Sequence, residues 1–287
     1  MKNILVTGAG GFIGSHLTEF LVSNGFDVKV LIKYNSNNNW GWLEKSKIKN
    51  DIEVVLGDVR DYDSVLKASV GCNSIFHLAA LIGIPYSYIS PKAYIDTNIV
   101  GTYNILEASK SLNLENILIT STSETYGTAQ YVPIDECHPM VGQSPYSASK
   151  IAADQLAISY FRSFDLPVKI VRPFNTYGPR QSARAIIPTV MSQILNNKNI
   201  INLGNISPTR DLTYVEDTCS GFFEIYKSKS LFGEITNIGM KDEISIENLV
   251  KLISEIMDTE ITINSDEKRI RPEKSEVERL YCENNKL

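Results

Sequence analysis

Short apolar runs of strand length alternate with segments whose apolar residues recur at helical spacing over the first 175 residues. The pattern predicts strands at 2–7, 27–33, 53–56, 74–78, 116–120 and 168–171. It predicts helices between them, the clearest at 15–22, 91–112 and 145–164. Such alternation is typical of βαβ units, whose right-handed crossovers build a parallel sheet covered by helices on both faces. We therefore expect an α/β fold with a doubly wound parallel sheet.

The pattern becomes less regular after Asn175. The further elements expected are helices at 186–195, 215–227 and 244–257 and strands at 200–203 and 234–238. Ser245 is in position to cap the last of these helices.

The two patterns divide the chain into two domains. Residues 1–175 are expected to form the main sheet, with 215–240 returning to it. Residues 176–214 and 241–287 are expected to form a smaller C-terminal α/β domain that binds the substrate. The polar residues at the end of the chain look like the start of a helix, so we expect a truncated C-terminus.

Composition excludes several classes of protein. The 287 residues, 43% of them hydrophobic, suffice for one large domain or two fused ones. A net charge of −5 without any basic block argues against nucleic acid as the main partner. Widely spaced cysteines and scattered histidines predict reduced thiols and no metal site. With a strand at the N-terminus and no apolar run near ~18 residues, we expect a cytoplasmic protein without signal peptide or membrane span.

A glycine-rich turn connects the first predicted strand to the first predicted helix. Gly8 can form a tight turn, Gly11 leaves space for a pyrophosphate, and Gly14 lets the helix lie close to the strand. The helix that follows offers N–H groups, those of Phe12 and Ile13 included, and a positive dipole end to an anion. Between a strand and a helix, these glycines predict a Rossmann-type dinucleotide-binding site.

Proton-transfer groups follow the fifth predicted strand. Thr122 and Glu124 come where the carboxyl ends of parallel strands line a ligand crevice. Tyr146 and Lys150 are four residues apart on a predicted helix, so they share one face. A neighbouring ammonium and a positive nicotinamide both favour the phenolate of a tyrosine. The pair is therefore suited to take a proton from a sugar hydroxyl while a hydride leaves the same carbon.

Six motifs in a fixed order carry a resemblance to a known family. They are Gly8-x-x-Gly11-x-x-Gly14, Gly57-Asp58-Val59, His77-Leu-Ala-Ala80, Thr122-Ser-Glu124, Tyr146-x-x-x-Lys150 and Arg172-Pro-Phe-Asn175-x-Tyr-Gly-Pro. Nearly the whole chain resembles the extended short-chain dehydrogenase/reductases, which include nucleotide-sugar epimerases, 4,6-dehydratases and decarboxylases. Ser121–Gly127 and Gly204–Asp211 are similar to bacterial N-acetylglucosamine 4,6-dehydratases of nonulosonic (legionaminic) acid biosynthesis.

The resemblance implies roles by position. For binding NAD(P) it implies Gly8, Gly11, Phe12, Ile13, Gly14, Asp58, Val59, Leu78, Ala79, Ala80, Tyr146 and Lys150. For catalysis it implies Thr122, Ser123, Glu124, Tyr146 and Lys150. For the sugar nucleotide it implies Asn175, Arg180, Arg184, Arg210 and Arg271, and guanidinium groups suit phosphate oxygens. It also implies a homodimer through the helices at 94–112 and 151–164.

Glu124 separates the reactions of this family. In a 4,6-dehydratase, Tyr146 takes the C4 hydroxyl proton while a hydride passes to the cofactor. Glu124 then removes the C5 proton and water leaves C6. The hydride returns to C6, so the cofactor is regenerated and stays bound. Many such dehydratases have Thr-Asp-Glu where this chain has Thr122-Ser123-Glu124, so the acid for the C6 hydroxyl stays open. A 4-epimerase, a UDP-glucuronate decarboxylase and a non-catalytic dinucleotide-binding regulator are the alternatives. The nucleotide of the substrate, UDP or GDP, is also left open.

The choice of cofactor depends on the end of the second strand. An NAD-binding chain usually has Asp or Glu there to hold the ribose hydroxyls. This chain has Ile32 followed by Lys33, with no acid nearby to repel a 2′-phosphate, and Lys33 is placed to pair with one and so to bind the cofactor. We therefore favour NADP, with NAD left open.

Overall fold

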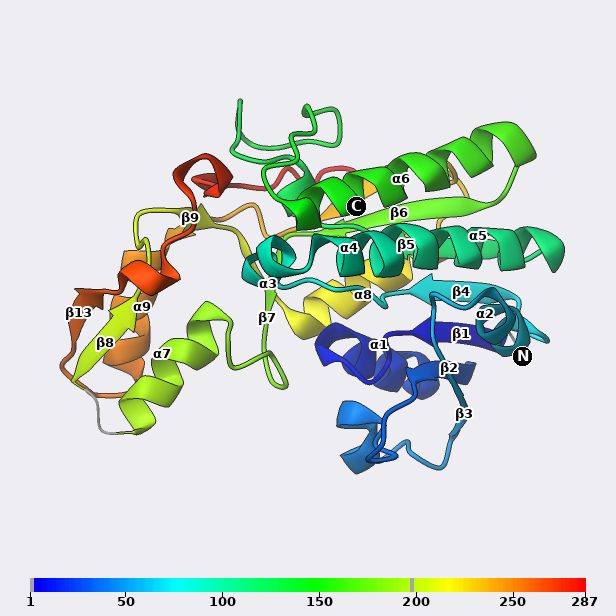
Figure 1. Cartoon of the computed structure of the whole chain (residues 1–287), viewed down its shortest axis with the longest axis horizontal. Helices are drawn as coiled ribbons and strands as arrows, with labels where there is room; N and C mark the ends of the chain where they lie inside the picture. Colours follow the sequence, from blue (N-terminus) through cyan, green and yellow to red (C-terminus); the bar gives the residue numbers. More distant parts are fainter. Residues whose placement is uncertain (1–2, 197–198) are drawn as a thin grey trace.

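A parallel seven-stranded sheet in the order β11-β6-β5-β4-β1-β2-β3 forms the larger lobe of the molecule (Figure 1). The computed structural model describes residues 3–196 and 199–287. Lys2, with which we expect the first strand to begin, lies outside these residues, as do 197–198 of the expected C-terminal domain. The sheet strands are β1 (Asn3–Thr7), β2 (Asp27–Lys33), β3 (Ile52–Gly57), β4 (Ser74–His77), β5 (Asn116–Thr120), β6 (Val168–Pro173) and β11 (Ile235–Ile238). This topology confirms the predicted doubly wound α/β fold.

Both faces of the sheet are covered by helices. The side chains of β1 alternate between the two faces, with Ile4 and Val6 in one hydrophobic core and Leu5 in the other. All three are fully buried, as expected for a parallel strand with helices on both sides. The covering helices are α1 (Phe12–Ser23) and α8 (Val215–Lys227) on one face, and α2 (Tyr62–Ser69), α5 (Gly101–Ser111) and α6 (Pro145–Phe164) on the other.

A smaller lobe lies beside the carboxyl ends of the sheet strands, at the left of Figure 1. Its core contains Val190, Ile201 and Val250, which lie apart from the two cores of the sheet. Strands β8 and β13 pair in parallel, and β12, β9 and β14 form a second small sheet. The elements of this lobe are α7 (Ile186–Leu195), β8 (Ile200–Leu203), β9 (Thr209–Arg210), β12 (Ile244–Ser245), α9 (Ile246–Ile256), β13 (Thr262–Ser265) and β14 (Arg279–Leu280). Strands β7 (Asn175–Tyr177) and β10 (Leu212–Tyr214) pair between the lobes.

The helix predicted over 91–112 contains a π-helical segment. It consists of α4 (Pro91–Tyr94), the π-helical η2 (Ile95–Val100) and α5. Within η2, the buried Asn98 amide accepts from the Leu81 N–H at 2.9 Å and donates to the Leu81 carbonyl at 3.0 Å. It also donates to Ser149 Oγ at 2.9 Å, which ties η2 to α6. Hydrophobic spacing does not reveal such a segment, because the contacts of Asn98 that accompany it are tertiary.

Several short elements were not predicted. Helix α2 is capped by Asp61, whose carboxylate accepts from the Ser64 N–H, so its capping signal was present in the sequence. Ser245 caps α9 as predicted, accepting from the Asn248 N–H. The remaining elements are η1 (Gly41–Lys45), α3 (Ile84–Ile89), η3 (Ser123–Thr125), η4 (Glu267–Arg269) and η5 (Glu273–Ser275).

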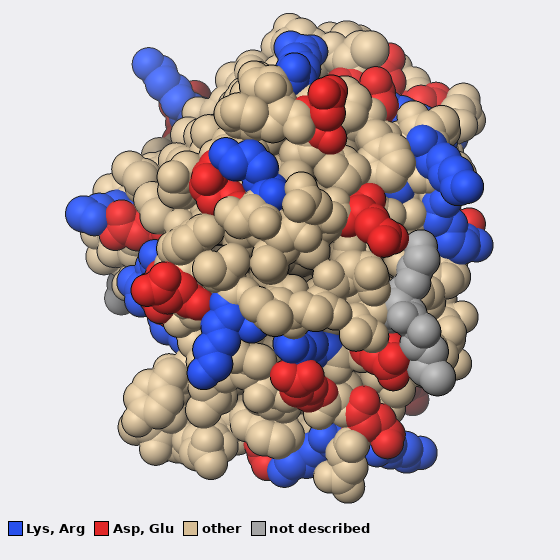
Figure 2. Space-filling model, turned by 90° about the vertical axis from the view of Figure 1, so that its right-hand side faces the viewer, with Lys and Arg blue, Asp and Glu red and all other residues tan. Residues whose placement is uncertain are grey.

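Acidic and basic side chains are intermixed on the face drawn in Figure 2, without a continuous area of Lys and Arg. Within residues 3–196 and 199–287, none of the helices has both the length and the apolar character needed to cross a bilayer. The same residues contain no group of three or more His, Cys, Asp or Glu side chains that could hold a metal ion.

Candidate active site

The turn between β1 and α1 fits the pyrophosphate of a dinucleotide. Gly8 has a φ of +73°, and a Cβ there would lie 2.7 Å from the Ala79 nitrogen. A Cβ on Gly14 would lie 2.2 Å from the Gly8 carbonyl oxygen, so a side chain there would push α1 away from β1. Gly11 precedes α1 at the N-cap position and has no side chain to cap the helix. The first N–H groups of the helix, including those of Phe12 and Ile13, are therefore left for an anion.

The ends of β2 and β3 lie side by side, because Lys33 pairs in register with Gly57. The Asp58 carboxylate is therefore 4.0 Å from Lys33 Nζ. Asp58 also accepts from Arg60 Nη2 at 2.6 Å, and this hydrogen bond lowers the pKa of Asp58. The expectation that no acid lies near Lys33 is thus wrong, since the acid comes from the neighbouring strand rather than from β2.

The residues after β4 are held against the glycine turn by Thr7. The Leu78 and Ala79 N–H groups donate to the Thr7 carbonyl and hydroxyl at 3.1 and 3.2 Å. The Thr7 hydroxyl also lies 2.8 Å from His77 Nδ1. Burial lowers the pKa of His77 to about 3, with the nearby Lys150 charge acting in the same direction, so the imidazole is neutral. Val59 is buried after β3, while Ala79 and Ala80 are half-buried.

Tyr146 and Lys150 lie one turn apart at the start of α6. The helix begins with a reciprocal cap, in which the Ser147 N–H donates to Ser144 Oγ and the Ser144 N–H donates to Ser147 Oγ. Both Tyr146 and Lys150 are buried. Lys150 Nζ donates to the Thr120 carbonyl at 2.6 Å, and burial lowers the pKa of Lys150 to about 8.

The pKa of the Tyr146 phenol is raised well above its ordinary value. Burial is the main cause, a hydrogen bond with the Thr122 side chain acts against it, and the Glu124 charge adds to the increase. The net shift is opposite to the direction expected from the Lys150 ammonium. Lys150 is directed at the Thr120 carbonyl, and desolvation of the phenolate outweighs the favourable contacts.

Glu124 follows β5 within electrostatic reach of both the tyrosine and an arginine of the smaller lobe. Thr122 opens the η3 turn, and its Oγ1 accepts from the Glu124 N–H at 3.3 Å. The charge of Glu124 acts on both Tyr146 and Arg210. Its half-buried carboxylate has no hydrogen bond or ion pair among the described residues. Ser123, which lies between Thr122 and Glu124 in the sequence, is buried. An unpaired carboxylate beside a phenol is able to accept a proton from a bound ligand.

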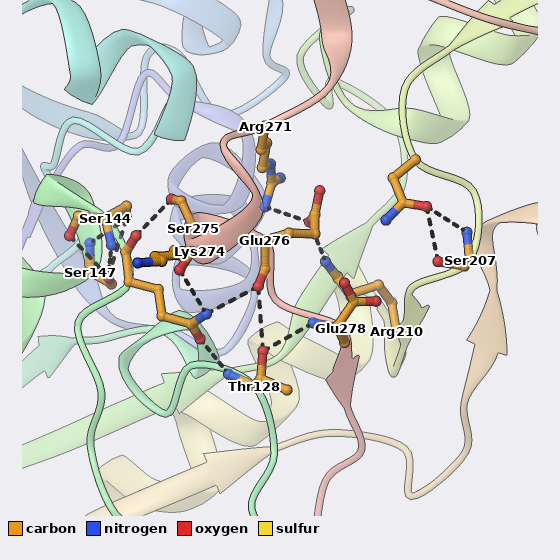
Figure 3. Close-up of polar contacts among 12 residues, drawn as sticks. Thr128, Ser144, Ser147, Ser207, Arg210, Arg271, Lys274, Ser275, Glu276 and Glu278 are labelled. Carbon is orange, nitrogen blue, oxygen red and sulfur yellow. Dashed lines mark hydrogen bonds and ion pairs between the residues drawn. The ribbon is translucent and has the colours of Figure 1, made fainter. Parts of the chain in front are cut away.

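Arg210 and Arg271 converge on one carboxylate, that of Glu276 (Figure 3). Arg210 Nη2 lies 3.7 Å and Arg271 Nη1 3.4 Å from the same oxygen, Glu276 Oε1. Arg210 comes from β9, and Arg271 and Glu276 come from the segment before β14. The structure thus brings together the two arginines expected at the diphosphate, and it adds a glutamate that sequence reasoning missed.

The other residues expected at the sugar nucleotide lie in different surroundings. Asn175 Oδ1 is buried without a partner among the described residues. Burial raises the pKa of Tyr94, and the charge of the exposed Arg184 acts against this, so Arg184 lies near the Tyr94–Tyr146 ring pair. Arg180 instead lies against α1, where it donates to Ser15 Oγ at 3.0 Å and to Glu19 Oε1 at 2.9 Å.

A buried ion pair behind the site was also missed. Asp154, one turn beyond Lys150 on α6, accepts from Arg172 Nη2 and from Ser121 Oγ, each at 2.6 Å. Both charged side chains are fully buried. The signal was present in the sequence, because Tyr146, Lys150 and Asp154 continue the same spacing of four residues.

A doubly wound sheet, a glycine-rich first turn and a Tyr–Lys pair at the carboxyl ends of the strands define a short-chain dehydrogenase/reductase of the extended type. The model of the GDP-mannose 4,6-dehydratase family matches residues 5–287, and the chain belongs to this family of nucleotide-sugar dehydratases and epimerases.

The proteins similar to this chain include relatives named as dehydratases and relatives named as epimerases. The dTDP-glucose 4,6-dehydratase of Streptomyces antibioticus is 31% identical over 88% of this chain and 76% of its own length. A Methanocaldococcus jannaschii protein provisionally named UDP-glucose 4-epimerase is 32% identical over 98% of this chain and 89% of its own length. Among solved structures, the dTDP-glucose 4,6-dehydratase DesIV of Streptomyces venezuelae, with NAD bound, matches with a TM-score of 0.89 and 26% identity. That match covers 99% of this chain and 89% of DesIV.

Proposed function

We propose that this protein is an NAD(P)-dependent nucleotide-sugar 4,6-dehydratase, a hydro-lyase that makes a 4-keto-6-deoxy sugar. The observation that carries the proposal is the half-buried Glu124 carboxylate, which has no hydrogen bond or ion pair among the described residues and whose charge acts on both Tyr146 and Arg210. We place the sugar beside this carboxylate, between the proton acceptor and the arginines proposed for the diphosphate. Dehydration requires a base for the C5 proton, whereas a simple 4-epimerase requires none here.

Each side chain of the site has a defined role in this reaction. NAD(P)⁺, held by Lys150 at the nicotinamide ribose, would supply the acceptor for a hydride from C4 and the donor of that hydride to C6. Tyr146 takes the C4 hydroxyl proton as the phenolate, which the positive charge of a bound nicotinamide would favour against the raised pKa of the phenol. The ketone that results makes the C5 proton acidic. Glu124 removes this proton and delivers it to the C6 hydroxyl, which leaves as water; with Ser123 at the neighbouring position, one carboxylate serves as base and acid. A proton returned to C5, equal to the one that Tyr146 took from the C4 hydroxyl, completes the product. Thr122 orients the phenol.

The proposed substrate is an NDP-N-acetylglucosamine, linked to GDP or UDP, on the route to a nonulosonic (legionaminic) acid. The resemblance of Ser121–Gly127 and Gly204–Asp211 supports this sugar. Arg210 and Arg271 are proposed to bind the diphosphate, and Asn175 and Arg184 to contact the substrate beside them. Arg180 is a weaker candidate, since Glu19 already compensates its charge.

NAD is the proposed cofactor. The Asp58 carboxylate lies 4.0 Å from Lys33 Nζ and 2.6 Å from Arg60 Nη2, so it compensates positive charge that a 2′-phosphate would need at the end of β2. Two similar dTDP-glucose 4,6-dehydratase structures contain NAD. This reverses the preference for NADP that the sequence suggested.

Product analysis tests the proposed reaction. The purified protein is incubated with UDP- and GDP-N-acetylglucosamine, UDP-glucuronate and GDP-mannose, and the products are analysed by mass. Loss of one water from a substrate is the expected result. Loss of carbon dioxide would indicate a decarboxylase, an isomer of unchanged mass an epimerase, and no turnover a regulator.

Glu124→Gln separates the base from the hydride chemistry. The variant is expected to lose water ~10³-fold more slowly, which is within the usual contribution of a general base. Reduced cofactor should still form, and its absorbance is measured in a single turnover. In the control Tyr146→Phe, both reduced cofactor and water loss are expected to disappear. Normal turnover by Glu124→Gln would refute the assignment of the base.

A homodimer through η2, α5 and α6 is also proposed. Large apolar side chains on these helices are exposed in the single chain, among them Ile95, Tyr103 and Phe164. Such a patch is typical of a protein–protein interface. A reducing, cytoplasmic location is proposed because all four cysteines are unpaired.

A further inference from the structure

Arg210, Glu276 and Arg271 form a group of two cations around one anion. The Arg210 and Glu276 side chains are only 9% and 11% exposed, while Arg271 is 27% exposed. Two neighbouring guanidinium groups with little access to solvent need a negative charge between them to reduce their repulsion. Glu276 supplies this charge in the structure, with one oxygen directed at both arginines.

The two contacts of Glu276 are long. At 3.7 and 3.4 Å they exceed the 2.7–2.9 Å typical of charge-assisted hydrogen bonds to a guanidinium. Arg210 makes its shortest contact elsewhere, from Nη1 to the Thr209 carbonyl at 2.8 Å. Most N–H groups of both arginines are therefore not engaged by Glu276, and a ligand that offers more oxygens and more charge would bind them better.

The backbone at Glu276 is held firmly, in contrast to its side chain. The segment 271–278, here named the strap, crosses the residues that precede α6 (Figure 3). The Glu276 carbonyl accepts from Gln143 Nε2 at 3.0 Å, and Ser275 Oγ donates to the Gln143 carbonyl at 2.6 Å. Rotation of the Glu276 side chain alone would therefore free the arginines without moving the strap. A cavity of about 530 Å³ bordered by Gly204, Arg271 and Glu276 offers space for that rotation.

We propose that Glu276 occupies the place of the substrate diphosphate between Arg210 and Arg271, and that the diphosphate displaces it on binding. Glu276 is then a residue that sets the affinity and specificity of the site. An anion must carry more charge than one carboxylate to replace it, so monoanions are excluded and diphosphates are accepted. The inference rests on the proposed nucleotide-sugar function.

The charge state of the group agrees with displacement. Burial lowers the pKa of Arg210, the Arg271 charge adds to this, and Glu124, Glu276 and Glu278 oppose it. Arg210 therefore faces three carboxylates and one cation in the absence of a ligand. A diphosphate that takes the place of Glu276 adds a second negative charge to the pair of arginines, and the carboxylate moves toward solvent.

The test is a binding measurement that needs no turnover. Binding of inorganic pyrophosphate, UDP and GDP to the full chain is measured by calorimetry for the wild type and for Glu276→Gln. Removal of a competing anion that makes two weak contacts is expected to lower Kd about fivefold for all three ligands. Glu276→Asp shortens the side chain by one methylene and moves its carboxylate away from the arginines. It is expected to change Kd in the same direction by a smaller factor. Thermal unfolding curves are recorded to check that each variant is folded.

Glu273→Gln is the matched control. Glu273 lies on the same strap and is exposed, and among the described residues it forms no ion pair with either arginine. Its Kd values are expected to stay within about twofold of the wild type. An equal or higher Kd for Glu276→Gln, or an equal decrease for Glu273→Gln, would overturn the inference.

The two proposals fail in different ways. If the wild-type chain binds none of the three ligands, both the nucleotide-sugar function and the role of Glu276 are refuted. If the ligands bind and Glu276→Gln leaves their Kd unchanged, only the role of Glu276 is refuted.

Discussion

At the scale of single residues, spacing predicted where the proposed reacting groups lie but not their charge states. A spacing of four positions from Tyr146 to Lys150 was enough to place them on one helix face, and the structure has them there. Their pKa values depend on burial by other elements, and on nearby charges such as Glu124 for Tyr146 and Asp154 for Lys150. A sequence does not show which side chains surround a residue, so it does not show its desolvation.

The pKa of Lys150 predicts an alkaline limit to activity. Because burial lowers this pKa to about 8, the ammonium is present below that pH and is lost as the pH rises through it. Loss of the charge weakens the proposed hold of Lys150 on the nicotinamide ribose. We therefore expect kcat/KM to fall tenfold per pH unit above about 8, measured under single-substrate conditions. Activity that stays constant up to about 10, near the ordinary pKa of lysine, would contradict this.

At the scale of elements, long amphipathic helices were predicted and local departures from them were not. Helices α6, α7 and α8 have the bounds expected from hydrophobic spacing. The π-helical η2 was missed, because its cause is a tertiary one. Asn98 turns inward to bond with the Leu81 backbone, which belongs to a loop after β4.

Asn98→Ala tests the role of η2. The variant leaves the half-buried Leu81 N–H and carbonyl and the buried Ser149 hydroxyl without the Asn98 partner. We expect the free energy of unfolding to fall by about 2–3 kcal/mol in urea denaturation. Asp96→Ala, at a half-buried position of the same segment that pairs with the exposed Lys92, is expected to cost less than about 1 kcal/mol. Equal stability of the two variants would show that Asn98 does not hold η2.

At the scale of the whole molecule, the sequence predicted candidate site residues but not all of their neighbours. The carboxyl ends of the strands are one edge of the sheet by topology, so the prediction that Thr122 and Glu124 lie at this edge depended only on the strand–helix alternation. The contact of Lys33 with Asp58 depends on which strands are neighbours in the sheet. The contact of Arg210 with Glu276 depends on the path of the strap. These contacts join residues distant in sequence, and no local pattern encodes them.

The proposed dimer makes a prediction at the same scale. Light scattering after gel filtration is expected to give twice the chain mass of 32.0 kDa. Tyr103→Glu places a charge in the exposed apolar patch of α5 and is expected to give the single-chain mass. Met191→Glu introduces the same charge at an exposed apolar position of α7, in the smaller lobe, and should remain dimeric. A wild-type chain of 32.0 kDa would refute the dimer.

The buried pair of Asp154 and Arg172 restricts how this site can change during evolution. Loss of either partner alone leaves an isolated charge with no access to water, at a cost of about 3–5 kcal/mol. Replacement of both by apolar residues of similar volume costs far less, but it requires two substitutions with an unstable intermediate between them. Descendants of this chain are therefore expected to keep or exchange the two residues together. Residues at the rim of the substrate site, such as Arg184, face solvent and can drift one at a time as the preferred sugar changes.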